Sequence, residues 1–310
     1  MRHLGTTLAE SVFQSLFDEI EGAMDFQFEA DISEIKDLDE GFEIHTNKGI
    51  VLSNRVGIGT GISEWLEGQA ASLGIDAGET RLDLGLRVEM KGDQLRNLLQ
   101  DTFETKLTYY GEGYSATTYC MNPKGRIIRK HQHGLVMPYG QNARERERPG
   151  ANLNFTLFIP RYYEDHDSAM EDAKKVIGGI NQDRGRIVIQ RLEDLKANRQ
   201  TNSLETNLIV PSLDAVPGNV KEEVPSLYWR GLLEMFDSLE GLIGEELHPD
   251  TLLYGIDAKF YEAKLHTNIY FGTDVRGLYL VGDCSGETHS LSQAAASGIY
   301  LGRMLNSDQY

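Results

Sequence analysis

The chain has 310 residues, 40% of them hydrophobic, and its 48 acidic residues outnumber its 30 basic ones, for a formal net charge of −18. A chain of this length buries roughly 75% of its unfolded surface on folding, so one large α/β unit or two unequal domains are expected. The acidic balance argues against a phosphate-tracking nucleic-acid surface. Mean hydropathy is −0.38, and no run approaches the roughly 20 apolar residues of a membrane helix.

Cysteine usage and the start of the sequence indicate the compartment. Two cysteines, Cys120 and Cys284, cannot form a disulfide framework. No basic-then-apolar leader opens the sequence, so a reducing, cytoplasmic location is expected. The arginines of segment 144–148 alternate with glutamates, which predicts a solvated loop, with a local anion contact as the alternative.

The amino-terminal part combines a helix with strands. Apolar residues recur at helical spacing over 7–24 and predict an amphipathic helix. Three strand-like runs follow at 26–35, 41–46 and 50–59, separated by turn sequences. The third run stops abruptly in the glycines of Val56 to Gly61, as strands do where a ligand approaches the backbone.

The middle of the chain, from about Gly78 to Ala263, is predicted to be mixed and mostly β. Strand candidates lie at 84–90, 106–110, 116–121, 126–128, 153–159 and 187–190, and helical segments at 167–180 and 227–239. A last strand at 277–281 leads into an alanine-rich helix over 291–305. The two chain ends therefore resemble an α/β protein that encloses a largely β insert.

The last strand delivers a carboxylate, Asp283, at its carboxyl end, where open α/β sheets bind ligands. Gly282 and Gly286 let the backbone pass close to a bound group. The small residues at 294–298 allow the following helix to pack tightly and to direct its dipole at that group. An anionic or electron-accepting ligand is expected, and an ordinary surface aspartate is the alternative.

The segment Gly277 to Gly298 resembles the Gly-Asp signature of FAD-dependent oxidoreductases with a glutathione-reductase-like or hydroxybenzoate-hydroxylase-like fold. The resemblance implies that Asp283 hydrogen-bonds the ribityl chain of FAD. It also implies that Ser292, Gln293 and Ala294 present backbone amides to the flavin.

A second turn, Gly59-Thr60-Gly61, is similar to the Ala-Thr-Gly turn of the same flavoproteins, with Gly59 in place of the usual alanine. In those proteins the strand before this turn follows a three-stranded meander, and its Thr-Gly passes near FAD. The resemblance therefore adds this turn to the expected cofactor-binding residues.

More of the chain resembles a narrower family, the poorly characterised bacterial and archaeal FAD-dependent dehydrogenases. The similar stretches are 3–6, 119–125, 178–191, 251–261 and the carboxyl-terminal signature. The implied fold class is α/β with α+β character: residues 1–77 and 264–310 form an incomplete FAD-binding fold, and 78–263 form an inserted, largely β substrate domain. The family usually has a second cysteine where this chain has Asn122, which removes support for two-thiol chemistry.

The Gly-x-Gly-x-x-Gly unit that binds the ADP half of FAD in that fold does not occur in the sequence. The nearest match, Gly111 to Ala116, precedes a strand-like run and predicts a hairpin turn. Three explanations stay open: another polypeptide supplies the unit, the gene is truncated, or flavin binding is weak or absent.

Single residues supply the catalytic candidates. His289, in the loop before the last helix, is the acid–base candidate, with an ordinary exposed histidine as the alternative. Cys120 is a candidate thiol facing the flavin, with plain packing as the favoured alternative. His131 and His133 would share a strand face, but without a third ligand at matching spacing no metal site is expected.

The leading functional hypothesis is an FAD-dependent oxidoreductase, or a carboxyl-terminal part or subunit of one, that transfers hydride between flavin and a small-molecule substrate. The alternative is a non-catalytic, flavoprotein-derived scaffold that acts as a binding or interaction module. A separate ADP-binding subunit or a second copy is an expected partner, whereas nucleic acid and a membrane span are not. A NAD(P)-linked reductase without flavin is a third hypothesis, with less support because the sequence has no glycine-rich phosphate-binding loop.

Overall fold

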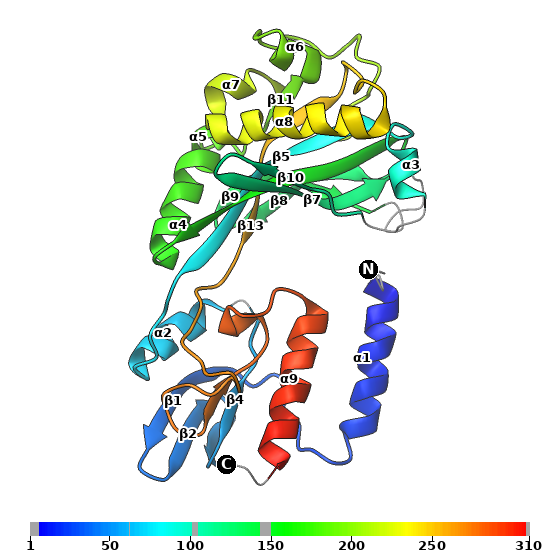
Figure 1. Cartoon of the computed structure of the whole chain (residues 1–310). Helices are drawn as coiled ribbons and strands as arrows, with labels where there is room; N and C mark the ends of the chain where they lie inside the picture. The colour runs from blue at the N-terminus through cyan, green and yellow to red at the C-terminus, as the bar shows by residue number, and fades with distance from the viewer. Residues whose placement is uncertain (1–5, 62, 101–104, 143–149, 308–310) are drawn as a thin grey trace. The chain divides into compact units, whose positions relative to one another are not determined.

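The computed structural model of the protein describes residues 6–61, 63–100, 105–142 and 150–307, which form a mixed helix-and-strand structure with a sheet-rich core. The chain divides into two compact units (Figure 1). The sheet unit contains Leu82–Tyr162 and Asp167–Phe260, and the terminal unit contains Leu4–Arg81, Tyr163–His166 and Tyr261–Tyr310. In the described ranges, no helix is both long and apolar enough to cross a bilayer.

The terminal unit is built from two small sheets and three helices. Its antiparallel meander consists of β1 (Ile32–Leu38), β2 (Gly41–Thr46) and β3 (Gly49–Ser53). A parallel pair consists of β4 (Val56–Ile58) and β14 (Leu278–Leu280). The helices are α1 (Thr6–Ile20), α2 (Glu64–Ser72) and α9 (Leu291–Asn306).

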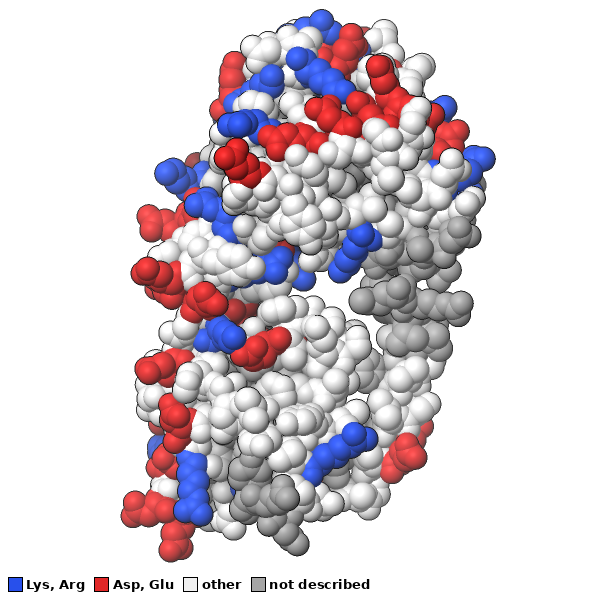
Figure 2. Space-filling model, viewed as in Figure 1, with Lys and Arg blue, Asp and Glu red and all other residues white. Residues whose placement is uncertain are grey.

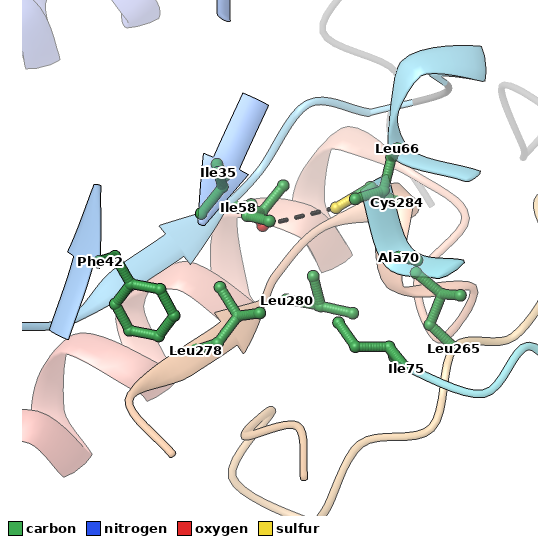
Figure 3. Close-up of a cluster of buried hydrophobic side chains, with 10 residues drawn as sticks. All are labelled: Ile35, Phe42, Ile58, Leu66, Ala70, Ile75, Leu265, Leu278, Leu280 and Cys284. Carbon is green, nitrogen blue, oxygen red and sulfur yellow. Dashed lines mark hydrogen bonds between the residues drawn. The ribbon is translucent and has the colours of Figure 1, made fainter. Parts of the chain in front are cut away.

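The core of the terminal unit joins segments from both ends of the chain. Phe42 of β2 lies beside Leu278 of β14, and Leu66 and Ala70 of α2 close the cluster near Cys284 (Figure 3). These side chains are buried, and the burial of apolar surface is the main force that holds such a unit together.

Two predicted strands of this region are wrong in extent. The run at 26–35 becomes a strand only from Ile32, because Glu29 adopts a left-handed φ of 53° that interrupts extended backbone. The run at 50–59 is split into β3 and β4, because the chain turns at Asn54, where the Arg55 N–H donates to Ser53 Oγ at 3.3 Å. The two pieces then pair with different partners, β2 and β14.

The sheet unit is organised around a seven-stranded sheet with the order β12-β11-β13-β5-β10-β7-β6. Its strands are β5 (Thr80–Lys91), β6 (Thr108–Gly111), β7 (Tyr114–Pro123), β10 (Asn152–Tyr163), β11 (Val188–Arg191), β12 (Val216–Pro217) and β13 (Leu252–Phe260). A separate hairpin consists of β8 (Arg126–Gln132) and β9 (Leu135–Gln141). The helices are α3 (Arg96–Leu99), α4 (His166–Ala173), α5 (Gly179–Asn181), α6 (Leu192–Lys196), α7 (Val220–Glu223) and α8 (Ser226–Ile243).

The central strand β5 shows why this sheet is covered on both faces. Its even positions from 82 to 90 are apolar, its odd positions include Asp83, Arg87 and Glu89, and both rows are buried. Successive side chains of a strand point to opposite faces, so β5 gives the sheet one apolar and one charged face.

Helix α8 lies across the apolar face (Figure 1), where a Cβ at its Gly231 would come within 2.7 Å of Ile159 Cδ1. The hairpin β8–β9 lies on the charged face: Gly140 of β9 is so close to the Arg87 guanidinium that only glycine fits. Ile127 of β8 packs with Ile189 and Leu252 on the same side.

Several sequence predictions for this unit are confirmed. Residues 111–114 form the β6–β7 hairpin turn, and the predicted helix at 227–239 lies within α8. The predicted helix at 167–180 is α4 followed by a π-helical turn at Lys174–Gly178. Segment 144–148 lies outside the described residues.

Candidate cofactor site

The two predicted glycine turns lie side by side because their strands are adjacent and parallel. Val56 of β4 pairs with Leu278 of β14, and Ile58 pairs with Leu280, so both strands end at the same edge. The Val281 N–H donates to the Ile58 carbonyl at 2.9 Å. A Cβ at Gly59 would lie 3.5 Å from Val281 Cγ2. Carboxyl ends of adjacent parallel strands are where open sheets bind ligands.

The Cys284 thiol links the two turns through hydrogen bonds. Its thiol lies 3.1 Å from the Val281 carbonyl oxygen and 3.4 Å from that of Ile58, and its side chain is buried (Figure 3). Burial raises the pKa of the Cys284 thiol, although contacts with Thr60 and the Gly61 backbone oppose the shift. A neutral thiol that donates hydrogen bonds is a structural link between the two turns.

The two glycines of the Asp283 turn, Gly282 and Gly286, are required for different physical reasons. Gly286 has a φ of 72°, and a Cβ there would lie 2.6 Å from the Lys264 Cα, so no other residue fits. Gly282 has a φ of 77°, and its N–H donates to Ser297 Oγ of α9 at 2.9 Å. This bond sets the turn against the last helix.

Asp283 has a hydrogen bond from the described residues at one of its two carboxylate oxygens. Its side chain is half-buried, and its Oδ1 accepts a bond from Thr288 Oγ1 at 2.7 Å. No described residue donates to Oδ2. A carboxylate held by one donor keeps lone pairs for the hydroxyl of a bound molecule.

The start of α9 is closed by a reciprocal cap that the sequence reading did not identify. The Ser290 side chain accepts from the Gln293 N–H at 3.3 Å, and Gln293 Oε1 accepts from the His289 N–H at 2.9 Å. This arrangement is related to the capping box, in which a glutamine three residues after the serine accepts from the N–H of the serine itself; here it accepts from the N–H of the residue before the serine. The Ala294 N–H bonds the Ser290 carbonyl at 2.9 Å.

The cap determines which backbone N–H groups at the start of α9 remain available to a ligand. Of the three predicted residues, Gln293 and Ala294 already use their N–H groups inside the helix start. The Ser292 N–H, like that of Leu291, bonds no other described residue, as expected in the first turn of a helix. Of the three predicted donors, Ser292 therefore keeps an available N–H, and Leu291 adds a second one.

The two catalytic candidates belong to different units. His289 is exposed in the terminal unit and stacks edge-on against the Tyr261 ring, with centroids 4.7 Å apart. The Arg81 guanidinium lies 4.9 Å from the centre of the same ring. Cys120 lies in the sheet unit. The geometry therefore groups His289, but not Cys120, with the glycine turns.

Cys120 sits above a buried polar network that sequence reasoning missed. Its carbonyl accepts from Arg87 Nη2 at 3.3 Å, and Arg87 Nη1 donates to Thr156 Oγ1 at 2.9 Å. Thr156 Oγ1 in turn donates to Asp257 Oδ2 at 2.6 Å. Burial lowers the pKa of Arg87 and raises that of Asp257, while each opposes the shift of the other. The alternation of charged and apolar residues over 80–91 was the signal for this network.

The predicted pairing of His131 and His133 on one strand face is wrong. His131 lies in β8, whereas His133 lies in the following turn with a φ of 52°. The His133 ring instead contacts Phe260, with centroids 4.8 Å apart. In the part of the chain that the structure describes, no three His, Cys, Asp or Glu residues are grouped as metal ligands.

A cavity of about 350 Å³ opens beside the turns in the terminal unit. Cys284 and Leu66 contribute to its wall, and the exposed carboxylate-bearing residues Glu67 and Asp76 lie at its margin. Glu67 is already paired with His166 at 2.9 Å. Most of the cavity wall is apolar, and Asp283 is not among the residues that line it.

Comparisons with known proteins identify only distant similarities. No protein-family model matches the sequence, and no curated protein matches it. Among solved structures, native FqzB is 12% identical with a TM-score of 0.34, over 94% of this chain and 50% of that one. A salicylate hydroxylase substrate complex is 13% identical with a TM-score of 0.33, over 94% and 54%. CtdE in complex with FAD is 10% identical with a TM-score of 0.29, over 90% and 53%.

The chain thus spans about half the length of the solved structures it matches.

Proposed function

We propose that this chain forms the flavin-binding part of an FAD-dependent, dehydrogenase-like oxidoreductase that transfers hydride between FAD and a small-molecule substrate. The main observation that supports this proposal is the parallel pairing of β4 with β14. Because of this pairing, the Gly59-Thr60-Gly61 turn lies beside the Asp283 turn. The proposal assigns residues 1–77 and 264–310 to cofactor binding and residues 78–263 to the substrate. The cytoplasmic location expected from the sequence belongs to the same proposal.

The residues present fit the flavin and ribityl half of FAD. A Cβ at Gly61 would meet nothing within 4 Å, and one at Gly59 would meet only Val281. Because glycine has no side chain, open space remains beside the backbone of Gly59 and Gly61, and we call this space the cradle. Asp283 Oδ2 offers an acceptor for a ribityl hydroxyl, and Ser292 offers an N–H at the positive end of the α9 dipole.

The ADP half of FAD lacks such a cradle in the described ranges. The one approximate glycine motif, at 111–116, is the β6–β7 hairpin. Strand β4 pairs with β14 on one side, and Gly57 at its centre is exposed. We propose that a separate subunit supplies the nucleotide-binding segment and completes the site along β4. A second copy of this chain is the other candidate to cover that strand edge, but it would bring no nucleotide-binding unit.

FAD, when bound, supplies the hydride chemistry. Asp283 orients the ribityl chain, and the start of α9 stabilises negative charge that develops on the nearby ring edge. His289, next in sequence to the Asp283 partner Thr288, holds or delivers a proton at its imidazole. Cys120 remains a second catalytic candidate on the substrate side.

A second candidate function is a non-catalytic interaction scaffold. Its supporting observation is the exposed apolar surface of the terminal unit, where Phe13 and Leu16 of α1 are each 50% exposed and Leu52 of β3 is 72% exposed. Exposed apolar patches of this kind are typical of surfaces that bind another protein.

Flavin uptake separates the two functions. The purified chain is incubated with FAD, freed of unbound cofactor and examined for the visible flavin absorbance. Retained flavin supports the oxidoreductase proposal, and a colourless protein supports the scaffold. Gly59→Val, which fills the cradle, should abolish retention. Gly68→Ala in α2, where the added Cβ would meet nothing within 4 Å and which is not among the proposed cofactor-binding residues, should leave it intact.

A further inference from the structure

The cavity of about 350 Å³ in the terminal unit has the size and the wall of a small-molecule site. Such sites typically enclose about 300–1,000 Å³ and combine mostly apolar side chains with a few polar groups. None of the residues proposed to bind FAD lines this cavity. The cavity can therefore take a ligand of its own.

Helix α2 provides one side of the cavity. Four of its residues line the cavity at helical spacing: Leu66, Glu67, Ala70 and Ala71. Residues three and four apart are neighbours on a helix surface, so these side chains form a single face. The two alanines leave space along this face that a larger side chain would fill.

Two backbone segments that pair with each other provide another side, namely 75–77 and 262–265. Ala77 and Leu265 oppose each other in an antiparallel bridge. The His266 N–H donates to the Asp76 carbonyl at 3.0 Å. Leu265 in turn lies beside Ala70 of α2 (Figure 3). Backbone hydrogen bonds and apolar packing therefore hold the wall in place before any ligand arrives.

The charged residues that line the cavity are all acidic. They are Glu67, Asp76 and Glu262, and none of the described lysines, arginines or histidines lines it. The nearby bases pair with acids: His166 with Glu67 at 2.9 Å, Lys264 with Glu287 at 2.9 Å and His266 with Asp274 at 3.3 Å.

Asp76 is the lining acid whose charge is available to a ligand. Its side chain is exposed at the margin of the cavity. No described residue donates a hydrogen bond to its carboxylate or forms an ion pair with it. A ligand that enters the apolar cavity therefore meets an unpaired negative charge at the edge.

We propose that this cavity binds a small organic amine, whose ammonium group pairs with Asp76 and whose apolar body lies inside the cavity. Removal of the apolar body from water supplies the driving force. Because Asp76 is exposed, the ammonium group stays partly hydrated, and the cost of burying a charge is avoided. An organic anion would meet only like charge at the same margin. The site does not depend on the proposed flavin chemistry.

Titration of the full chain with 2-phenylethylamine at pH 7 and constant ionic strength, followed by nuclear magnetic resonance of the ligand, tests the site. The amine should bind saturably. 2-Phenylethanol, which has the same ring without the charge, should bind at least about threefold more weakly, as expected for the loss of an ion pair that water reaches. 3-Phenylpropionate should bind more weakly still, and methylammonium, which has no apolar body, should show no saturable binding.

Asp76→Asn should weaken the binding of 2-phenylethylamine by at least about threefold and leave that of 2-phenylethanol unchanged, because only the charge is removed. Glu79→Gln is the matched control, since Glu79 is exposed three residues later and does not line the cavity. This variant should bind the amine like wild type.

Ala71→Phe should weaken the binding of both ligands by about tenfold or more, because its ring takes the place of the apolar body. Ala71 is exposed, so the fold tolerates the larger side chain, which circular dichroism checks. Ala23→Phe, at an exposed alanine that does not line the cavity, should change neither affinity.

The inference is overturned if 2-phenylethanol or 3-phenylpropionate binds as tightly as the amine. It is also overturned if Asp76→Asn or folded Ala71→Phe binds the amine like wild type, or if Glu79→Gln or Ala23→Phe weakens binding equally. FAD is absent from these titrations, so their outcome is separate from that of the cofactor experiments.

Discussion

The two units differ in the side chains that they bury and expose. The sheet unit buries charge: Asp83, Arg87 and Glu89 of β5 are at most 1% exposed. The terminal unit exposes apolar side chains on α1 and β3. Its helix α9 has a single charged residue, Arg303, and the surface around α9 is largely uncharged (Figure 2).

The difference indicates how complete each unit is. Buried charges persist only where partners satisfy them, and within the sheet unit Asp257 and Glu89 accept hydrogen bonds from Thr156 and Tyr254, respectively. An uncharged helix and an open strand edge instead indicate a surface that another molecule covers. The terminal unit is thus where we expect a cofactor or partner to bind.

The largest effect is expected from breaking the buried pair of the sheet unit. Arg87→Met should lower the free energy of unfolding by about 3–5 kcal/mol, because it leaves Asp257 buried without its cation. Urea denaturation followed by circular dichroism measures the change. The double variant Arg87→Met/Asp257→Asn should recover part of the loss, and a loss below about 1 kcal/mol for the single variant would show that the pair is not buried as described.

In the terminal unit, Gly286→Ala should cost at least about 2 kcal/mol, because alanine opposes both the positive φ and the approach of the Lys264 backbone. Gly298→Ala is the matched control: this glycine lies within α9, and its Cβ would meet nothing within 4 Å. That variant should be more stable than wild type by about 0.5–1 kcal/mol. Thermal unfolding of both variants checks the contrast, and equal effects would contradict the geometry of the turn.

A carboxylate of α6 provides a test of charge satisfaction that depends on pH. Burial acts to raise the pKa of Asp194, but hydrogen bonds from Thr201 and Arg199 outweigh it and lower the pKa below its usual value. The folded state therefore binds the proton less well than the unfolded chain, so the stabilisation is complete above the ordinary carboxyl pKa and is lost as pH falls through the folded one.

Asp194→Asn should cost about 1.5 kcal/mol at pH 7, the value of a hydrogen bond to a charged group. The difference from wild type should shrink as the pH falls below about 4. Unfolding free energies measured from pH 7 to pH 3 give the result. A difference that stays constant with pH would mean that the Asp194 charge does not contribute to the effect.

The smallest effect on stability is expected at the exposed apolar surface. Leu16→Ser should change the free energy of unfolding by less than about 0.5 kcal/mol, because the side chain is half exposed. Leu232→Ala in α8, whose side chain is fully buried, should cost about 2–5 kcal/mol.

Sedimentation velocity should show less self-association for Leu16→Ser than for wild type if α1 is part of an interaction surface. Unchanged sedimentation would remove the support that Leu16 gives to the scaffold alternative. A loss of stability similar to that of Leu232→Ala would show instead that α1 is packed within the unit.

The sequence predicted most of the regular elements because their signals are local. The alternation in β5 and the periodicity of α8 are both readable in short windows. The serine–glutamine spacing before α9 is equally local, but the sequence prediction did not use it. The break between β3 and β4 was missed, because it depends on which distant strand each half joins.

The candidate site was predictable only in part for the same reason. The Gly-Asp turn carries its own motif, whereas the cavity acquires its wall from α2 and from two segments, 75–77 and 262–265, that lie far apart in the sequence. The β-bulge of β7 at Cys120 likewise depends on pairing with β10 and leaves no mark in the sequence. Such convergence is a property of topology and not of any local pattern.

The most direct test of the central claim, that the terminal unit holds the flavin half of FAD through Asp283, is a titration of FMN with the purified chain, followed by quenching of flavin fluorescence. FMN lacks the ADP half, so the missing nucleotide cradle does not limit its binding. The account predicts saturable quenching that Asp283→Ala weakens by about tenfold or more and that Glu287→Ala, at the exposed end of the same turn, leaves unchanged. Absence of quenching, or equal affinity of the wild type and Asp283→Ala, would contradict it.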